Sequence, residues 1–255
     1  MSMTEQTVIE QNQMAQNSDG AAPTVKTAEH SMLQDNHVAS PLGRRSFIRG
    51  TGALLGTAAA GAAAIFGSSE DAIAHDGGGP NHNFRHQLKL VQRHENAHVQ
   101  FLVGALGAAA RPKPTFKNLL QQNFQGFIDV SRALENTGVG AYLGAAPAIL
   151  EPAYLAAAGS IALVEARHAG FFNAFESRPM TENVFGQELD FERALTVQEV
   201  VANASPFVAS LNGGPPLTFS STRSTSNDIA ILNFALALEY LEADFYNINV
   251  PRYGR

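Results

Sequence analysis

The chain of 255 residues contains no cysteine and no tryptophan, and only 16% of its residues are charged. The absence of cysteine excludes disulfides, thiolate metal sites and cysteine nucleophiles. The formal net charge is −6. Nucleic-acid binding normally requires a basic patch, so we expect no nucleic-acid partner. Any metal ion would therefore have to be bound without thiolate sulfur.

Long apolar runs are also missing. Residues 1–43 are polar, and we expect a disordered extension because they bury too little apolar surface to offset ordering entropy. The stretch "GRRSFIRGTGALLGTAAAGAAAIFG" (43–67) places an arginine pair before a weakly apolar run, and Ala72, Ile73 and Ala74 follow as a small-x-small cleavage site. Residues 44–74 thus resemble a twin-arginine export signal.

This signal predicts a periplasmic or extracellular protein whose partner during export is the twin-arginine machinery. The apolar run is poor material for a span of about 20 apolar residues, so we expect no stable membrane span in the mature form. An uncleaved anchor is the alternative. The twin-arginine route exports folded proteins, which lets a protein take up its metal before export.

The remaining chain predicts an all-α fold without a convincing strand. Three- and four-residue spacing of apolar side chains predicts four long helices, at about 84–110, 115–145, 153–175 and 228–247. We therefore expect an antiparallel four-helix bundle, with three helices from 75–176 and the last from 227–255. Residues 177–226 are expected to form an irregular appendage. Within it, "TVQE" (196–199) predicts a capping box that opens a short helix, and residues 226–228 are expected to cap the last long helix.

Six ionisable side chains interrupt the apolar stripes of these helices. They are Glu95, His98, Glu135, Glu165, His168 and Glu239. Four of them form two Glu-x-x-His pairs, whose members share one helix face and can each reach one metal ion. The other two are single glutamates. One such pair is usually a surface feature of modest value, but two pairs and two single glutamates on separate apolar stripes favour a shared metal site.

Electrostatics supports the same interpretation. Four carboxylates in a bundle interior are costly, because desolvation and mutual repulsion oppose their ionisation. Two divalent cations would neutralise them, and two neutral imidazoles would complete the ligand set. Oxygen and nitrogen ligands favour iron, with manganese or zinc as alternatives.

Other polar residues lie close to these six in the sequence. Tyr142 and Tyr246 each follow a single glutamate by seven residues, so they are candidates for hydrogen bonding to the ligands or for electron transfer, although a core tyrosine is the commoner case. Glu242 is either an extra ligand or a solvated flank. His94 points about 100° away from its neighbour Glu95, which predicts a supporting or surface residue.

The stretches "LNFALALEYLEADFY", "RHENAHVQFLVGALGA", "LENTGVGAYLGAA" and "AGSIALVEARHAGFF" are similar to the motifs of exported ferritin-like domain proteins, a group that includes desiccation-related and stress-related members. The resemblance implies a ferritin-like bundle with a di-iron-type site whose ligands are the six residues above. The helix that normally comes first comes last here. A circular permutation would explain this order, as would exchange of the last helix between the two protomers of a homodimer.

The leading functional hypothesis is an exported di-metal protein that oxidises Fe²⁺ or consumes peroxide or oxygen in stress protection. The alternative is a non-catalytic protective or structural protein with an inert or vestigial metal site. A third hypothesis is a small-molecule pocket lined by Phe171, Phe172 and Tyr142.

Overall fold

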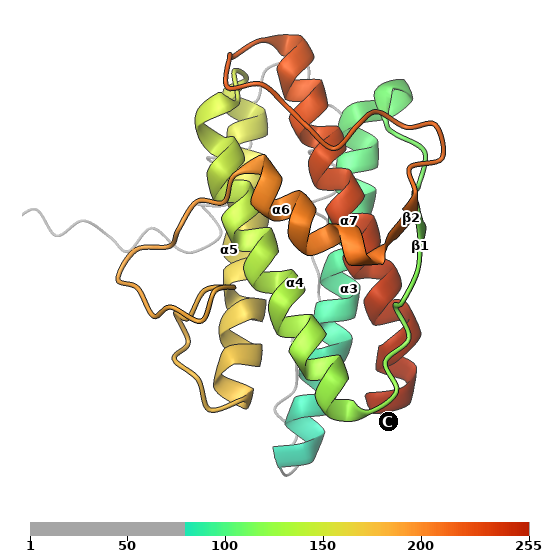
Figure 1. Ribbon diagram of the computed structural model, residues 1–255, viewed down its shortest axis with the longest axis vertical. Helices are drawn as coiled ribbons and strands as arrows, with labels where there is room; N and C mark the ends of the chain where they lie inside the picture. The colour runs from blue at the N-terminus through green and yellow to red at the C-terminus, as the bar shows by residue number, and fades with distance from the viewer. Residues whose placement is uncertain (1–79, 255) are drawn as a thin grey trace, which may run out of the picture. The chain divides into compact units, whose positions relative to one another are not determined.

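The computed structural model describes residues 80–254, and the expected N-terminal extension and twin-arginine segment lie outside them. Four long helices lie side by side in Figure 1, which confirms the predicted all-α bundle. They are α3 (Pro80–Leu106), α4 (Phe124–Ala145), α5 (Pro152–Phe175) and α7 (Thr225–Tyr253). None of the described helices is both long and apolar enough to cross a bilayer.

The helices form two pairs. Helix α3 packs against α7, α4 packs against α5, and α4 also contacts α7. Within each pair the two helices run in opposite directions, whereas α3 and α4 run the same way (Figure 1). The last helix packs within its own chain, so its exchange between protomers is not needed to complete the bundle.

The start of α3 and the end of α7 lie at the same end of the bundle. Phe84 on α3 and Tyr253 on α7 both contact the ring of Phe124, with ring centroids 5.7 Å away in each case. A circular permutation requires this proximity, because the two ends would be joined by a loop in the usual helix order. The permutation itself stays a prediction.

The start of the second long helix differs from the sequence prediction. We expected a helix from Thr115, but α4 begins at Phe124, where the side chain of Asn123 accepts a hydrogen bond from the Gly126 amide at 2.8 Å. The residues before this N-cap include a short strand, β1 (Thr115–Phe116). The short strand was not predicted either.

The reason is the direction of the helices. Because α3 and α4 run the same way, the link between them must run back along the bundle. An extended chain covers more length per residue than a helix, which favours an extended path here. The link follows α7: the Arg111 amide donates to Asn233 Oδ1 at 2.7 Å, and the Gln121 amide donates to Asn249 Oδ1 at 3.0 Å. Prolines at 112 and 114 also disfavour helix there.

The appendage, residues 177–224, carries the chain back along the bundle. It contains α6 (Val197–Ala204) and β2 (Val208–Ser210), which pairs antiparallel with β1. The predicted capping box at Thr196 and Glu199 is confirmed. Short 3₁₀ turns also occur at Gly107–Ala109, Ala146–Ala148 and Ser205–Phe207.

The cap of the last helix lies earlier in the chain than the expected residues 226–228. Ser224 caps α7 by accepting a hydrogen bond from the Asn227 amide at 3.1 Å. Asp228 has another task, since its carboxylate accepts hydrogen bonds from the amides of Leu150 and Glu151 at 2.8 and 2.9 Å. The first turn of α7 is thereby fixed to the start of α5.

Buried apolar side chains form two clusters. On α3, Leu88 and Val91 belong to one cluster and Leu102 to the other, with Glu95 and His98 between them. Helix α5 follows the same pattern. The polar centre therefore lies between one apolar cluster and the other.

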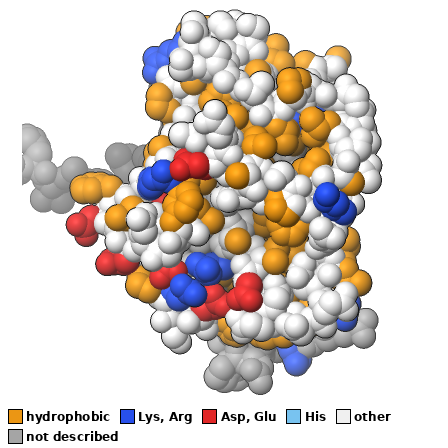
Figure 2. Space-filling view, viewed as in Figure 1, with side chains coloured by type: hydrophobic (Ala, Val, Ile, Leu, Met, Phe, Trp, Pro, Cys, Tyr) orange, Lys and Arg blue, Asp and Glu red, His pale blue; other side chains and the backbone are white. Residues whose placement is uncertain are grey.

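The appendage lies directly against α4. Charged side chains gather over it in Figure 2, and no histidine is visible on that face. The Leu195 amide donates to the Gly140 carbonyl at 2.9 Å. A Cβ atom at Gly140 would lie 2.4 Å from the Leu195 side chain, and one at Gly144 would lie 2.1 Å from the Leu195 carbonyl oxygen. This close approach explains why small residues are needed on that face of α4.

We therefore expect Gly144→Ala to lower the free energy of unfolding by about 1–3 kcal/mol, because the added methyl group displaces the backbone at Leu195. Gly159→Ala is the matched control. Gly159 is an exposed residue of α5, and a Cβ atom there meets nothing within 4 Å. Alanine should therefore stabilise the helix by about 0.5–1 kcal/mol. Urea denaturation measures both changes. Equal stability of the wild type and the Gly144 variant would contradict this packing.

Candidate metal centre

The structure brings all six predicted ligand residues together in the bundle interior. They form two sets of four, and within each set one possible ligand atom from every residue lies within 4.8 Å of the others. Three of the glutamates are fully buried, and Glu239, His168 and His98 are 1%, 5% and 9% exposed. All four long helices contribute. The role of these residues as metal ligands stays a prediction.

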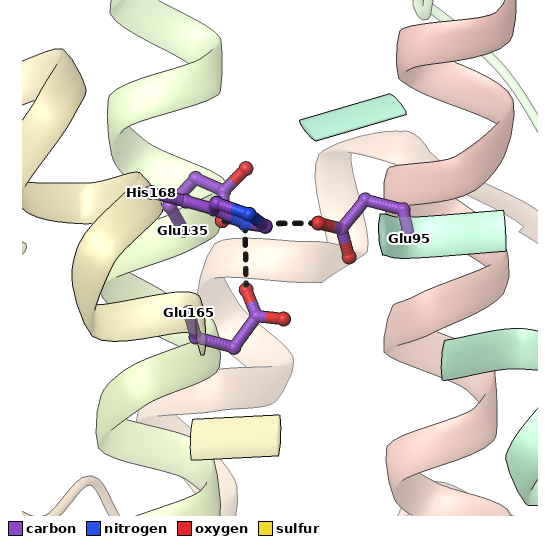
Figure 3. Close-up of side chains that lie close together, drawn as sticks. All are labelled: Glu95, Glu135, Glu165 and His168. Carbon is purple, nitrogen blue, oxygen red and sulfur yellow. Dashed lines mark hydrogen bonds and ion pairs between the residues drawn. The ribbon is translucent and has the colours of Figure 1, made fainter. Parts of the chain in front are cut away.

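Glu95 and Glu165 belong to both sets. Glu95 Oε2 lies 3.3 Å from His98 Nδ1, while its Oε1 lies 3.0 Å from His168 Nδ1. Glu165 spans the same two imidazoles, with Oε1 at 3.0 Å from His98 Nδ1 and Oε2 at 3.9 Å from His168 Nδ1. Figure 3 shows Glu95 and Glu165 approaching His168 from two helices. This is the placement required of carboxylates that bridge two cations.

The two single glutamates are each close to one histidine. Glu135 Oε2 lies 3.1 Å from His168 Nδ1, and Glu239 Oε2 lies 3.2 Å from His98 Nδ1. The expectation that each Glu-x-x-His pair can reach one metal ion stays a prediction, and the glutamate and histidine of each pair do lie in one set. The structure adds that the glutamate of each pair also reaches the histidine of the other pair.

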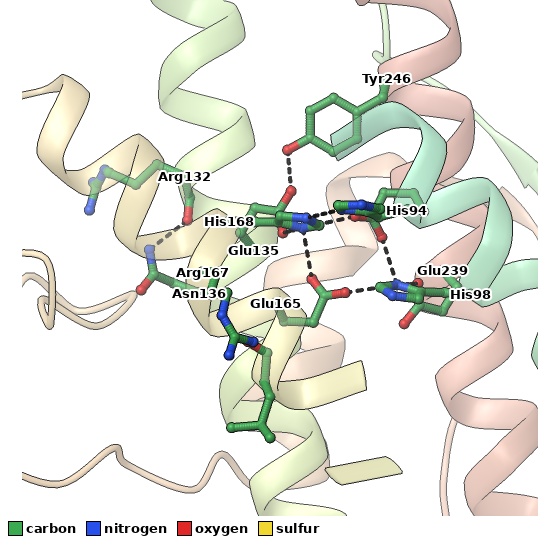
Figure 4. A network of polar contacts seen from close by, with 12 residues as sticks. His94, His98, Arg132, Glu135, Asn136, Glu165, Arg167, His168, Glu239 and Tyr246 are labelled. Atoms are coloured by element: carbon green, nitrogen blue, oxygen red, sulfur yellow. Dashed lines mark hydrogen bonds and ion pairs between the residues drawn. The ribbon is translucent and has the colours of Figure 1, made fainter. Parts of the chain in front are cut away.

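Two tyrosines hold these two single glutamates, which we call the terminal glutamates. The Tyr142 hydroxyl donates to Glu239 Oε1 at 2.5 Å. The Tyr246 hydroxyl donates to Glu135 Oε1, and Figure 4 shows this second contact. Each tyrosine thus bonds the glutamate of the opposite helix. Seven residues separate it from the glutamate on its own helix, which is about 10 Å along the axis. Each terminal glutamate uses Oε1 for the tyrosine and keeps Oε2 toward the histidine.

Burial disfavours the charges of the bridging glutamates. It raises the pKa of Glu95 to about 7 and the pKa of Glu165 to about 8, and neighbouring carboxylates add to the rise, Glu165 for the former and Glu135 for the latter. Burial also raises the pKa of both tyrosines well above the usual value, and Glu239 and Glu135 reinforce the effect. The tyrosines therefore stay protonated and act as donors.

The histidines respond in the opposite sense. Burial alone would lower their pKa values, but the surrounding carboxylates outweigh it. The pKa of His168 rises to about 11, chiefly because of Glu135, and that of His98 rises further, chiefly because of Glu165. Without metal, the protons on the two Nδ1 atoms supply the positive charge that the carboxylates require.

The hydrogen bonds of the protein alone do not satisfy the bridging carboxylates. Oε1 of Glu95 and both oxygens of Glu165 are buried and accept no hydrogen bond from the described residues. Two of these oxygens, Glu95 Oε1 and Glu165 Oε1, lie 3.0 Å from an imidazole nitrogen but accept no hydrogen bond from it. Buried oxygens without donors are costly. Cations between the two glutamates would satisfy them, so the residues present fit a pair of metal ions.

A fifth carboxylate lies beside the centre. Glu242 is only 3% exposed, which excludes the solvated flank as its role. Burial, followed by the charge of Glu165, raises its pKa well above the usual value. It belongs to neither ligand set. With Thr137 and Gly138 it lines a cavity of about 10 Å³, large enough for roughly one water molecule. The spacing Glu239–Glu242 was the sequence signal for this residue.

The hypothesis of an aromatic small-molecule pocket is not supported by the packing. Phe171 and Phe172 pack with one apolar cluster, where Phe172 lies against Tyr246 with ring centroids 6.2 Å apart. Tyr142 belongs to the other cluster. These side chains are core residues on opposite sides of the polar centre.

A helical bundle with two glutamates shared between two histidines defines the class of carboxylate–histidine metal proteins. The family model described as "Ferritin-like domain" matches residues 56–177 and 227–254, which is more than half of the chain. The protein therefore belongs to the ferritin-like family. The match omits 178–226, which hold most of the appendage. Searches of curated proteins and of solved structures gave no significant match.

The pKa shifts predict the pH dependence of stability in the metal-free protein. In the folded state, Glu95 and Glu165 stay protonated at pH values above 4.5, the ordinary pKa of glutamate. His98 and His168 likewise stay protonated at pH values above 6.5, the ordinary pKa of histidine. Because the unfolded chain releases these protons first, the free energy of unfolding should fall between about pH 5 and pH 8. The slope should be about 1.4 kcal/mol per pH unit for each extra proton held.

Urea denaturation in the presence of a chelator measures this slope. Replacing both bridging glutamates, Glu95→Gln with Glu165→Gln, should flatten it below pH 6.5. Saturating metal should reverse it, since metal binding requires deprotonated ligands. Stability of the metal-free protein that increases from pH 5 to pH 8 would contradict the electrostatic account.

Proposed function

We propose that this chain is an exported di-metal protein that oxidises ferrous iron or consumes peroxide or oxygen in stress protection. The observation that carries the proposal is the shared position of Glu95 and Glu165, each of which reaches both His98 and His168. A single-metal site or a structural ion pair does not require two glutamates that each span two imidazoles.

The four glutamates would hold and neutralise the metal pair. Glu95 and Glu165 would bridge the two ions, while Glu135 and Glu239 would each bind one of them. The charges of four carboxylates equal those of two divalent cations, so the buried centre becomes neutral when the histidines bind as neutral imidazoles. Oxygen-rich ligand sets with imidazole suit iron first, with manganese or zinc as alternatives.

When bound, a pair of redox-active ions supplies two-electron chemistry toward an oxidant. The chain's own residues exclude water and position the ligands. Apolar layers close the centre along the bundle axis. Tyr142 and Tyr246 hold the terminal glutamates from the opposite helix and keep one oxygen of each directed at the centre. We propose this positioning, together with electron transfer, as their catalytic role.

Export is part of the same proposal. The twin-arginine segment supports it, because that route carries folded proteins and would deliver this one with its metal already bound. The protein would then act in the periplasm or outside the cell. Exported metal proteins of this kind meet oxidants directly, which accords with a protective role.

The direct test is ferrous iron oxidation by the purified protein. Metal-free protein is loaded anaerobically with two Fe²⁺ per chain and exposed to air, and near-ultraviolet absorbance of the ferric product is followed. We expect Glu95→Gln and Glu165→Gln to slow the reaction at least roughly 10–100-fold, as loss of support does at metal sites. Glu192→Gln, at an exposed position of the appendage, is the control and should react like the wild type.

Hydrogen peroxide replaces air in a second arm, because the proposal includes either oxidant. No reaction in either arm, from protein that has bound two Fe²⁺ per chain, would contradict the redox function and favour the inert protective alternative. Oxidation that is unchanged in the Glu95 and Glu165 variants would place the reaction elsewhere.

A further inference from the structure

His94 makes a contact that the proposed ligand set does not use. Its Nδ1 lies 2.9 Å from His168 Nε2. The two ring planes are only 8° apart, and the ring centroids are 5.2 Å apart. A short nitrogen–nitrogen distance with nearly parallel planes and a long centroid distance means that the rings meet edge to edge in one plane, as Figure 4 shows. The contact is a hydrogen bond and not a stack.

The direction of this hydrogen bond follows from the other side of His168. Its Nδ1 faces Glu95, Glu135 and Glu165 at 3.0, 3.1 and 3.9 Å, so Nδ1 is the atom directed at the centre. An imidazole that binds a metal through Nδ1 carries its proton on Nε2. His168 Nε2–H must then donate to His94 Nδ1, and the ring of His168 is held in one tautomer and one orientation.

The other half of the centre has no such support. His98 also directs Nδ1 at the carboxylates, but within residues 80–254 its Nε2 has no hydrogen-bond partner. The sequence shows why. His94 precedes the glutamate of the Glu-x-x-His pair on α3, and the equivalent position on α5 is Val164. Valine offers no acceptor, so the two related halves of the centre differ at this position.

We propose that His94 is a positioning residue that makes the two metal positions unequal, so that the ion bound by His168 and Glu135 is held more tightly than the ion bound by His98 and Glu239. The inference rests on the proposed di-metal function and adds an order of filling to it. Hydrogen bonds from metal-bound histidines to outer residues fix the ring and increase its basicity, and their loss typically weakens metal binding 10–100-fold.

The two positions would consequently have different tasks. The tighter position would keep its ion, while the weaker one, next to the less supported His98, would fill last and empty first. His98 is also the more exposed of the two ligand histidines, at 9% against 5%. Both differences direct exchange of metal with the surroundings toward the His98 position.

The experiment is an anaerobic equilibrium titration of the metal-free protein with Co²⁺, followed by calorimetry and by the visible absorbance of bound cobalt. Wild-type protein should bind two ions in two steps of different affinity. His94→Val, which makes the two halves alike at this position, should weaken the tighter step roughly 10–100-fold and bring the two steps together. His94→Asn keeps a hydrogen-bond acceptor near the position of the wild-type His94 Nδ1. It should therefore restore most of the difference in affinity between the two steps.

Val164→Ala is the matched control, because it changes the equivalent position without altering a hydrogen bond, and both affinities should stay as in the wild type. His94→Ala replaces the valine variant if circular dichroism shows that the latter does not fold. Equal affinities in the wild type, or affinities that stay unchanged in the His94→Val variant, would overturn the inference alone. Wild-type protein that binds fewer than two Co²⁺ would overturn the proposed function and the inference with it.

Discussion

Four carboxylates buried at one point impose the constraint on which the rest of this structure depends. Glu95, Glu135 and Glu165 are fully buried and Glu239 is nearly so, and a low-dielectric interior does not tolerate their unbalanced charge. In the protein without metal, protons on the carboxylates and imidazoles supply the balance. A pair of divalent cations would supply it better, because it would also satisfy the carboxylate oxygens that accept no hydrogen bond from the described residues.

The surrounding fold limits the access of water to this centre and fixes the relative positions of the helices that form it. Apolar clusters close it along the bundle axis, and the appendage covers α4, where Gly140 and Gly144 allow Leu195 to approach closely. The crossover before α4 follows α7 and is fixed to it by Asn233 and Asn249. These contacts explain how the chain returns along the bundle and places its last helix against α3.

Much of the fold and of the cluster could be predicted from the sequence because helical spacing determines which side chains share a face. The Glu-x-x-His pairs, the lone glutamates and their apolar neighbours followed from that rule. The sequence could not show which glutamates reach both histidines, because this depends on the angles between helices. Nor could it show that each tyrosine bonds the opposite helix, or that Thr115 is extended, since both follow from the direction in which α3, α4 and α7 run.

The central claim is that two metal ions lie between Glu95 and Glu165. Anomalous diffraction from crystals of the protein isolated with its native metal, recorded on either side of the metal's absorption edge, tests it most directly. The account predicts two peaks about 3.5–4 Å apart, one beside His168 and Glu135 and the other beside His98 and Glu239. No peak inside the bundle, or metal found only at surface residues, would contradict it.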